Sequence, residues 1–395
     1  MVSNEQEYLF SLESKGIKLG LERTVRLLKK CKSPHKGLNV IQIVGTNGKG
    51  STSAVLSKLL NLEYSVGLYT SPHLYSFNER IRVNGKPISN QTVSKFIKKF
   101  KPQIESVDAS FFEVMTVMAV WYFSVKKVDY AIMETGLGGK FDSVTACGAK
   151  TIGISPISMD HSHILGETIL EIANEKIAAI SPRSDVFSVF QLKNINEKIK
   201  EKCKANNSRL NFVETDHGLN LSLRGDHQKQ NASLALAISK NILKTTDHNI
   251  EKCLMSIKWH GRNQTIKANP DIIFDVGHNE DGIKSFLKFL TNSKKSYRKK
   301  TLLLCIQKKK NIAKVSRRLD VFFDKKIYST TNPARSMQYF EIKKYFNDIE
   351  YIKKPESALK SVLKNAQKND LIAIVGTHYW GNSLKGFFNI CFDNI

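Results

Sequence analysis

The sequence has little of what marks several large classes of protein. Its apolar runs stay below the roughly 20 residues that a membrane-spanning helix needs. Its first residues, MVSNEQEYLF, lack the charged-then-apolar layout of a signal peptide. We therefore expect a cytoplasmic protein with no membrane partner. The cysteines show no CxxC spacing, which argues against a zinc site or a disulfide framework and suits a reducing compartment. They are Cys31, Cys147, Cys203, Cys253, Cys305 and Cys391.

The charge balance is strongly basic. Lys and Arg number 61 against 36 Asp and Glu, which gives a formal net charge of +25. Such a charge is one sign of nucleic-acid binding. The lysines are spread along the whole chain, however, and aromatic residues do not interleave with them as a stacking platform requires. We interpret most of this charge as a solvated surface, with attraction of anionic small substrates or nucleic acid as the alternatives.

The length and the apolar pattern predict two α/β domains. At 395 residues the chain exceeds the size at which one core usually stops growing. Short apolar runs alternate with helix-like stretches, which is typical of parallel sheets flanked by helices. A boundary is expected near 259–263, so the predicted domains are 1–262 and 263–395. The predicted strands are 39–44, 66–70, 129–134, 151–155, 271–276, 301–306, 326–330 and 371–376.

A glycine-rich segment between the first predicted strand and a predicted helix over 51–60 carries the strongest functional signal. A turn of this kind directs backbone N–H groups and the positive end of the helix at one point, where a phosphate binds. Lys49 would add charge for the terminal phosphates, and Ser51 a hydroxyl near a metal ion. The strict phosphate-loop pattern differs at Ile43 and Gly50, so a plain glycine turn that caps a helix is the alternative. The segment comprises Gly45, Thr46, Asn47, Gly48, Lys49, Gly50 and Ser51.

Polar residues also stand at the ends of three other predicted strands. They are Ser71, Glu134 and His161. In open α/β sheets ligands bind outside the carboxyl ends of the strands, so we expect these residues to share one site with Lys49. A hydroxyl, a carboxylate and an imidazole beside nucleotide phosphates are predicted to hold a divalent cation. Taken one at a time, some of these residues have a purely structural interpretation. Glu134 could be a capping partner and His161 a core histidine with satisfied hydrogen bonds. Lys176, in a predicted helix further along the chain, could be a solvated lysine paired with a glutamate.

Taken together, the motifs resemble the folylpolyglutamate synthase/dihydrofolate synthase branch of the Mur ligase superfamily. The resemblance implies an α/β fold: an N-terminal P-loop-type ATPase domain with a mainly parallel sheet, and a smaller C-terminal Rossmann-like domain. The matching segments follow the family's order over most of the chain. They are GTNGKGS (45–51), TSPHL with FNERI (70–81), FFE (111–113), ETGLGG (134–139), DH with LGETILEIANEK (160–176), GDHQKQNA (225–232), HGRN (260–263) and DVGHN (275–279).

The resemblance also implies roles for individual residues. Catalytic roles are implied for Lys49, Lys176 and His278. Nucleotide contacts beyond the glycine-rich segment are implied for Asn231, Arg262, Asp275 and His278. Magnesium ligands are implied at Ser51, Ser71, Glu134, His161 and, in carbamylated form, Lys176. Carbamylation turns the ammonium of Lys176 into an anionic group that helps to bind a second ion.

The implied reaction is an ATP-driven amide synthesis. A carboxylate of dihydropteroate or of a folate polyglutamate attacks the γ-phosphate of ATP, and L-glutamate then attacks the acyl phosphate. The expected cofactors are ATP, two magnesium ions and a monovalent cation. We expect a monomer without a nucleic-acid partner. Two alternatives stay open: a Mur-type cell-wall amino-acid ligase, and a basic nucleic-acid-binding NTPase motivated by the charge.

Overall fold

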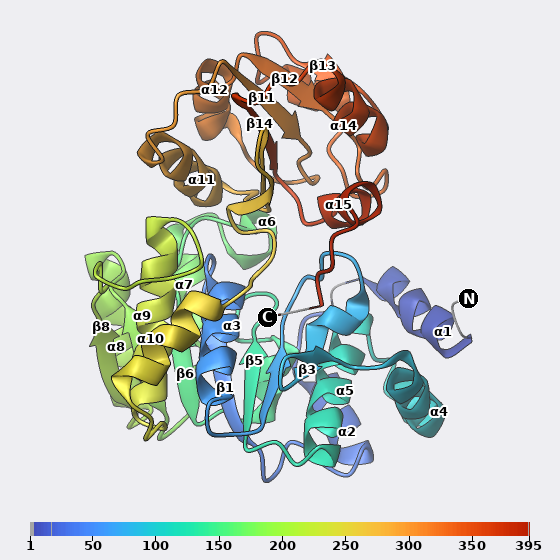
Figure 1. The fold of residues 1–395 in the computed structure, drawn as a ribbon. Helices are drawn as coiled ribbons and strands as arrows, with labels where there is room; N and C mark the ends of the chain where they lie inside the picture. Colours follow the sequence, from blue (N-terminus) through green and yellow to red (C-terminus); the bar gives the residue numbers. More distant parts are fainter. Residues whose placement is uncertain (1–3, 17, 394) are drawn as a thin grey trace.

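The computed structural model describes residues 4–16, 18–393 and 395, which form two sheets with helices packed on both faces of each (Figure 1). The first sheet has the order β4-β3-β2-β5-β1-β6-β7-β8. From β2 to β8 neighbouring strands are parallel, and β3 and β4 continue the sheet in antiparallel fashion. The strands are β1 (Asn39–Val44), β2 (Val66–Tyr69), β3 (Ile81–Val83), β4 (Lys86–Pro87), β5 (Tyr130–Glu134), β6 (Thr151–Ile154), β7 (Asp185–Val189) and β8 (Arg209–Val213).

The centre of this sheet is buried on both faces, which explains why β1 is apolar apart from Asn39 and Gln42. Val40 and Val44 pack into a core shared with α1, α2, α4, α5, α7 and α8, whereas Ile41 and Ile43 pack into one shared with α3, α9 and α10. The helices are α1 (Asn4–Ser11), α2 (Glu22–Lys30), α3 (Lys49–Leu60), α4 (Asn90–Ser106), α5 (Phe111–Val125), α6 (Ser162–Leu165), α7 (Ile169–Ile177), α8 (Lys193–Ala205), α9 (Asp226–Lys240) and α10 (Asp247–Ser256), with 3-10 turns η1 (Leu12–Lys15), η2 (Phe77–Arg80) and η3 (Ser143–Cys147).

The second sheet, drawn in orange and red in Figure 1, has the order β13-β12-β11-β14-β10-β9. Only β9 runs antiparallel to its neighbour. Helices α11 to α13 pack on one face, and α14 and α15 on the other. The elements are β9 (Gln264–Lys267), β10 (Asp271–Asp275), α11 (Glu280–Asn292), β11 (Lys299–Leu304), α12 (Ala313–Phe322), β12 (Lys325–Tyr328), α13 (Tyr339–Lys343), β13 (Glu350–Tyr351), α14 (Pro355–Lys364), β14 (Asp370–Val375) and α15 (Trp380–Phe388).

All eight predicted strands are confirmed, as is the α/β fold with two mainly parallel sheets. The sequence did not predict the short or polar strands β3, β4, β7, β8, β9 and β13. The division into domains 1–262 and 263–395 stays a prediction, although β9 begins at Gln264. In the described part of the chain, no helix combines the length and the apolar character that a membrane crossing requires.

The last residues of the chain return to the first sheet (Figure 1). The buried guanidinium of Arg82 donates to the carbonyl oxygens of Phe392, at 3.2 Å, and of Asp393. Lys58 of α3 donates to the carbonyl oxygen of Ile395 at 3.1 Å. The end of the predicted second domain is therefore packed against the first sheet.

Candidate active site

The turn between β1 and α3 has the geometry of a phosphate-binding loop. Gly48 caps the helix in the left-handed region, with φ of 86°, where a side chain would also collide with Asn231. Lys49 begins α3, and its Nζ donates to the carbonyl oxygen of Thr46 at 3.0 Å. The Ser51 hydroxyl is buried and has no hydrogen-bond partner among the described residues. A buried hydroxyl of this kind is ready for a ligand atom.

A cleft of about 410 Å³ lies in front of this loop and is lined from both sheets. All residues predicted to contact the nucleotide line it except Gly45. Besides Ser51, two further predicted metal ligands line it, Ser71 and Glu134. The predicted residues that line the cleft are Thr46, Asn47, Gly48, Lys49, Gly50, Ser51, Ser71, Glu134, Asn231, Arg262, Asp275 and His278. Residues far apart in sequence are thus gathered around one space, although their individual roles stay predictions.

Apart from Lys176, the predicted metal ligands lie in two groups. Glu134 is buried at the end of β5, and its Oε2 accepts the Ser71 backbone N–H at 3.0 Å. Burial raises the pKa of Glu134, an effect opposed by Lys49 and by the Ser71 N–H. His161, in the left-handed conformation, stands in the second group, with Nε2 at 3.3 Å from Lys310 Nζ. Across the described residues, no three or more His, Cys, Asp and Glu side chains cluster as a metal cage would need.

The oxygen donors beside the phosphate loop are of the kind that binds magnesium. The partnerless Ser51 hydroxyl and the Glu134 carboxylate line the same cleft and are oxygen donors, the type that magnesium prefers. Nucleotide phosphates would have to complete the coordination, since these two residues are too few on their own. One magnesium site beside the phosphate loop therefore fits the residues present.

Lys176 lies in α7 and is only 5% exposed. Burial, reinforced by the positive charge of Lys49, lowers the pKa of its ammonium to about 7. It lines neither the nucleotide cleft nor the neighbouring cavity described below. As an ammonium it would repel a metal ion, so a second ion fits only if Lys176 is carbamylated.

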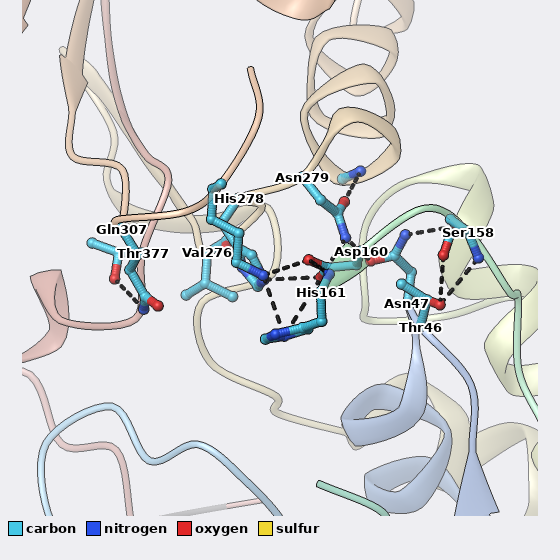
Figure 2. A network of polar contacts seen from close by, with 12 residues as sticks. Thr46, Asn47, Ser158, Asp160, His161, Val276, His278, Asn279, Gln307 and Thr377 are labelled. Carbon is cyan, nitrogen blue, oxygen red and sulfur yellow. Dashed lines mark hydrogen bonds and ion pairs between the residues drawn. The ribbon is translucent and has the colours of Figure 1, made fainter. Parts of the chain in front are cut away.

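Asp160 is the centre of a polar network that joins the two sheets (Figure 2). Its Oδ1 lies 2.5 Å from Lys310 Nζ and its Oδ2 lies 3.6 Å from His278 Nε2. Asn279 Nδ2 donates to Asp160 Oδ2 at 3.2 Å and to Asn47 Oδ1 of the phosphate loop at 3.0 Å. Burial alone would raise the pKa of Asp160, but His278 and Lys310 outweigh it and hold that pKa far below its usual range.

The same network fixes the charge of His161. Burial and the nearby Lys310 lower its pKa to about 4, so the imidazole is neutral at pH 7 and has a lone pair available. Sequence reasoning did not select Asp160, Asn279 or Lys310 as site residues. Asp160 and Asn279 belong to the segments DH and DVGHN, which match the family. Lys310 belongs to the lysine run QKKKN, which has the composition of a solvated surface.

A second, more apolar cavity of about 270 Å³ adjoins the nucleotide cleft. Ser71 and Pro72 line both spaces, so they mark the point where the two meet. Its acidic side chains already have partners: Asp142 accepts three backbone N–H groups, and Glu113 pairs with Arg23 at 3.0 Å. Its other lining residues include Leu19, Gly20, Arg80, Phe112, Leu137, Phe141 and His161. The sequence had not located such a cavity.

Comparisons with known proteins agree with this arrangement. Residues 261–378 match the family model "Mur ligase, glutamate ligase domain". The Bacillus subtilis dihydrofolate synthase/folylpolyglutamate synthase is 32% identical over 306 residues, which are 68% of this chain and 71% of that protein. A Haloferax volcanii protein named as a probable bifunctional folylpolyglutamate synthase/dihydropteroate synthase is 30% identical over 69% of this chain, but the match spans only 37% of its longer sequence.

A solved structure shows the same fold over nearly the whole chain. The Mycobacterium tuberculosis folylpolyglutamate synthase, complexed with ADP and AMPPCP, superposes with a TM-score of 0.89 at 23% identity and covers 98% of this chain and 100% of that one. The family resemblance of the sequence is thereby confirmed. This chain is an ATP-dependent, amide-forming ligase and belongs to the folylpolyglutamate synthase/dihydrofolate synthase family of Mur ligases.

Proposed function

We propose that this protein adds L-glutamate both to dihydropteroate and to reduced folates, with ATP as the energy source. The observation that carries the proposal is the meeting of two cavities at Ser71 and Pro72. One contains the phosphate loop and Lys49, and the other is apolar and lined by Phe112, Leu137 and other side chains suited to an aromatic ring. An aromatic acid in the second cavity would present its carboxylate to a nucleotide in the first.

In the first chemical step, an oxygen of the acceptor carboxylate attacks the γ-phosphorus and the bond to the β–γ bridging oxygen breaks, which gives an acyl phosphate and ADP. The protein's part in such a transfer is mainly positioning and charge neutralisation. Lys49 at the start of α3 supplies positive charge. The side chain of Asn231, in α9, lies against Gly48 of the loop. Magnesium held by Ser51 and Glu134 would add to the neutralisation of phosphate charge.

In the second step, the amine nitrogen of L-glutamate attacks the acyl carbon, a C–N bond forms, and the tetrahedral intermediate expels phosphate as the amine loses its proton. The oxyanion that develops needs a nearby cation or donor. His278 and Lys310 of the second sheet reach this region through Asp160. We propose that they serve this step, and that residues 1–262 and 263–395 act as two domains which exclude water from the acyl phosphate.

The remaining parts of the proposal concern Lys176 and the location of the protein. A lysine with a pKa of about 7 supplies the free amine that carbamylation requires. A cytoplasmic location fits six cysteines that are all free. The protein is proposed to work as a monomer.

A coupled ADP-release assay tests the function. The purified protein is given Mg·ATP with dihydropteroate or a reduced folate, and the amino acid is varied. We expect turnover with L-glutamate and none with D-glutamate or L-aspartate. Absence of glutamate-dependent turnover on every pteroate and folate would refute the proposal. Lys49→Ala should abolish turnover and leave thermal unfolding of the nucleotide-free protein nearly unchanged.

A further inference from the structure

The apolar cavity contains a cation whose charge no acidic group in the described structure neutralises. Arg80, in η2, donates from Nε to His73 Nδ1 at 2.9 Å, and its guanidinium carbon lies 5.3 Å from the centre of the Phe111 ring. Within the described residues it forms no ion pair, and its terminal nitrogens have no hydrogen-bond partner. The other cation of the cavity, Lys18, is paired with Asp108.

The setting of Arg80 favours an anionic ligand. Arg80 is half-buried, and the loss of hydration lowers the pKa of its guanidinium; the charges that oppose this effect, such as Glu13 and Glu134, are not in contact with it. An arginine nevertheless keeps its charge, so even partial burial without an anionic partner is unfavourable until an anion binds. The two acids of the cavity are already engaged, Asp142 by backbone N–H groups and Glu113 by Arg23. The partner of Arg80 must therefore come from a ligand.

The position of Arg80 indicates which anion this is. Ser71 and Pro72 line both cavities, whereas Arg80 lines the apolar cavity and not the nucleotide cleft. The carboxylate that attacks ATP has to lie at Ser71 with a free oxygen. A guanidinium that held this carboxylate in a bidentate pair would occupy both of its oxygens. A folate ends in a glutamate with a second carboxylate, the α-carboxylate, which does not react.

We propose that Arg80 binds the non-reacting α-carboxylate of the terminal glutamate of a folyl acceptor. This inference rests on the proposed function and adds a specificity determinant to it. Dihydropteroate has no second carboxylate, so Arg80 contributes to the extension of folates and not to the first addition of glutamate. One active site would then accept both acceptors, and Arg80 would set the balance between them.

The test compares three acceptors in the ADP-release assay: a reduced folate monoglutamate, its α-carboxamide analogue, and dihydropteroate. For the parent protein, we expect the α-carboxamide to lower kcat/KM about 10- to 100-fold relative to the folate, since a charge-assisted pair is lost. Arg80→Met should lower kcat/KM for the folate by a similar factor and no longer distinguish the two folyl acceptors. Its kcat/KM for dihydropteroate should stay within about threefold.

Two further variants make the comparison specific. Arg80→Lys should recover part of the preference for the α-carboxylate, because it keeps the charge but not the bidentate geometry. Arg26→Met, which removes an exposed arginine of α2, should behave as the parent on all three acceptors. If Arg80→Met fails to fold, the comparison of the folate with its α-carboxamide in the parent protein becomes the test, and equal kcat/KM values for the two would overturn the inference.

The outcomes separate this inference from the proposed function. A parent protein that shows no glutamate-dependent turnover on any acceptor overturns the proposed function. A parent that uses both acceptors but is indifferent to the α-carboxamide overturns only the role of Arg80. A parent that uses dihydropteroate and no folate overturns the role of Arg80 together with the folate part of the proposed function. An equal loss on dihydropteroate and folate in Arg80→Met also overturns it.

Discussion

Lys310 and Asp160 form an ion pair between the two sheets, with 2.5 Å between Nζ and Oδ1. Lys310 follows β11 of the second sheet, and Asp160 follows β6 of the first. The two side chains are only 8% and 10% exposed, so neither charge is well hydrated. Because His161 and His278 contact the same pair, the relative placement of the sheets is tied to the charge at the site.

Breaking this pair from one side should destabilise the protein and stop turnover. Lys310→Met removes the lysine partner of the buried Asp160 carboxylate and leaves it with His278, Asn279 and the backbone N–H of His161. Loss of one member of a buried pair costs about 3–5 kcal/mol. We expect a fall of that order in the free energy of unfolding, measured by urea denaturation, together with a loss of glutamate-dependent ADP release.

The neighbouring Lys309 supplies a matched control. It belongs to the same lysine run but is exposed, and its side chain forms no hydrogen bond or ion pair in the described structure. Lys309→Met should change stability by less than about 0.5 kcal/mol. The double variant Lys310→Met with Asp160→Asn should regain part of the lost stability, since neither charge is then left alone. A double variant as unstable as the sum of the two single variants would show that the residues do not act as a pair.

The contrast between Lys49 and Lys310 shows how far the sequence predicts this site. Lys49 is predictable because the strand, the glycine turn and the helix around it are consecutive in sequence, so local rules place it. Lys310 lies 150 residues from Asp160, and its neighbours in the run QKKKN look like a solvated surface. No local sequence pattern indicates that, of the three lysines in this run, Lys310 is the one buried against Asp160.

The missed strands have a similar cause. β8 is an edge strand whose sequence, RLNFV, carries polar residues because the side chains of Arg209 and Asn211 are exposed. β7, with the sequence DVFSV, is central, but Ser188 interrupts its apolar pattern; its hydroxyl is satisfied by the carbonyl oxygen of Val189 at 2.8 Å. A buried hydroxyl that is satisfied in this way is acceptable inside a sheet, although the apolar pattern of the sequence does not indicate it.

Ser51 should matter only when a nucleotide is bound. Its buried hydroxyl has no partner in the described structure, so Ser51→Ala removes an unsatisfied group and should leave the nucleotide-free protein as stable as the parent or slightly more so. The stabilisation by Mg·AMPPNP should shrink, since a tenfold weaker affinity removes about 1.4 kcal/mol of ligand stabilisation. Thermal unfolding with and without Mg·AMPPNP measures both effects.

Ser53 is the control for this experiment. It lies on the same helix and its hydroxyl is also buried without a partner among the described residues, but it does not line the nucleotide cleft. Ser53→Ala should keep the full response to Mg·AMPPNP. An equal shift in the two alanine variants would argue against a role of the Ser51 hydroxyl in nucleotide binding.

Asn279 is expected to act through its amide donor. Its side-chain oxygen accepts the Gly282 N–H at 2.9 Å and caps α11, while its Nδ2 donates to Asn47 and Asp160. Asn279→Asp keeps the cap but removes the donor and places a carboxylate beside Asp160. We expect kcat/KM to fall at least tenfold with α11 intact by circular dichroism, since a buried like-charge pair is unfavourable.

The exchange variant checks this explanation. In Asn279→Asp with Asp160→Asn, the amide is restored on the other side of the contact and only one carboxylate remains. Relative to Asn279→Asp alone, the double variant should regain thermal stability, even if Lys310 has lost its partner and turnover stays low. If stability does not recover, the contact between residues 279 and 160 is not what the substitution disturbs.

The buried Lys176 should make stability depend on pH in a definite direction. Its pKa is about 7 in the folded protein, against an ordinary value of 10.5 for a lysine. Between these two values the unfolded chain binds one proton more than the folded protein at this residue. The free energy of unfolding therefore rises with pH through this window on account of Lys176, and below pH 7 the full penalty of the buried charge is present.

Lys176→Met removes the titrating group, so in the absence of carbon dioxide it should be more stable than the parent at pH 7, with the difference shrinking toward pH 10. Urea denaturation across this range measures the two slopes, and Lys240→Met, at the exposed end of α9, should keep the parent's slope.

Bicarbonate should stabilise and activate the parent but not Lys176→Met, because the free amine of Lys176 can form a carbamate. With ¹³C-labelled bicarbonate the carbamate should be visible as an NMR signal. A parent protein with the same slope as Lys176→Met would contradict the lowered pKa, and a missing carbamate signal would remove Lys176 from the proposed metal site.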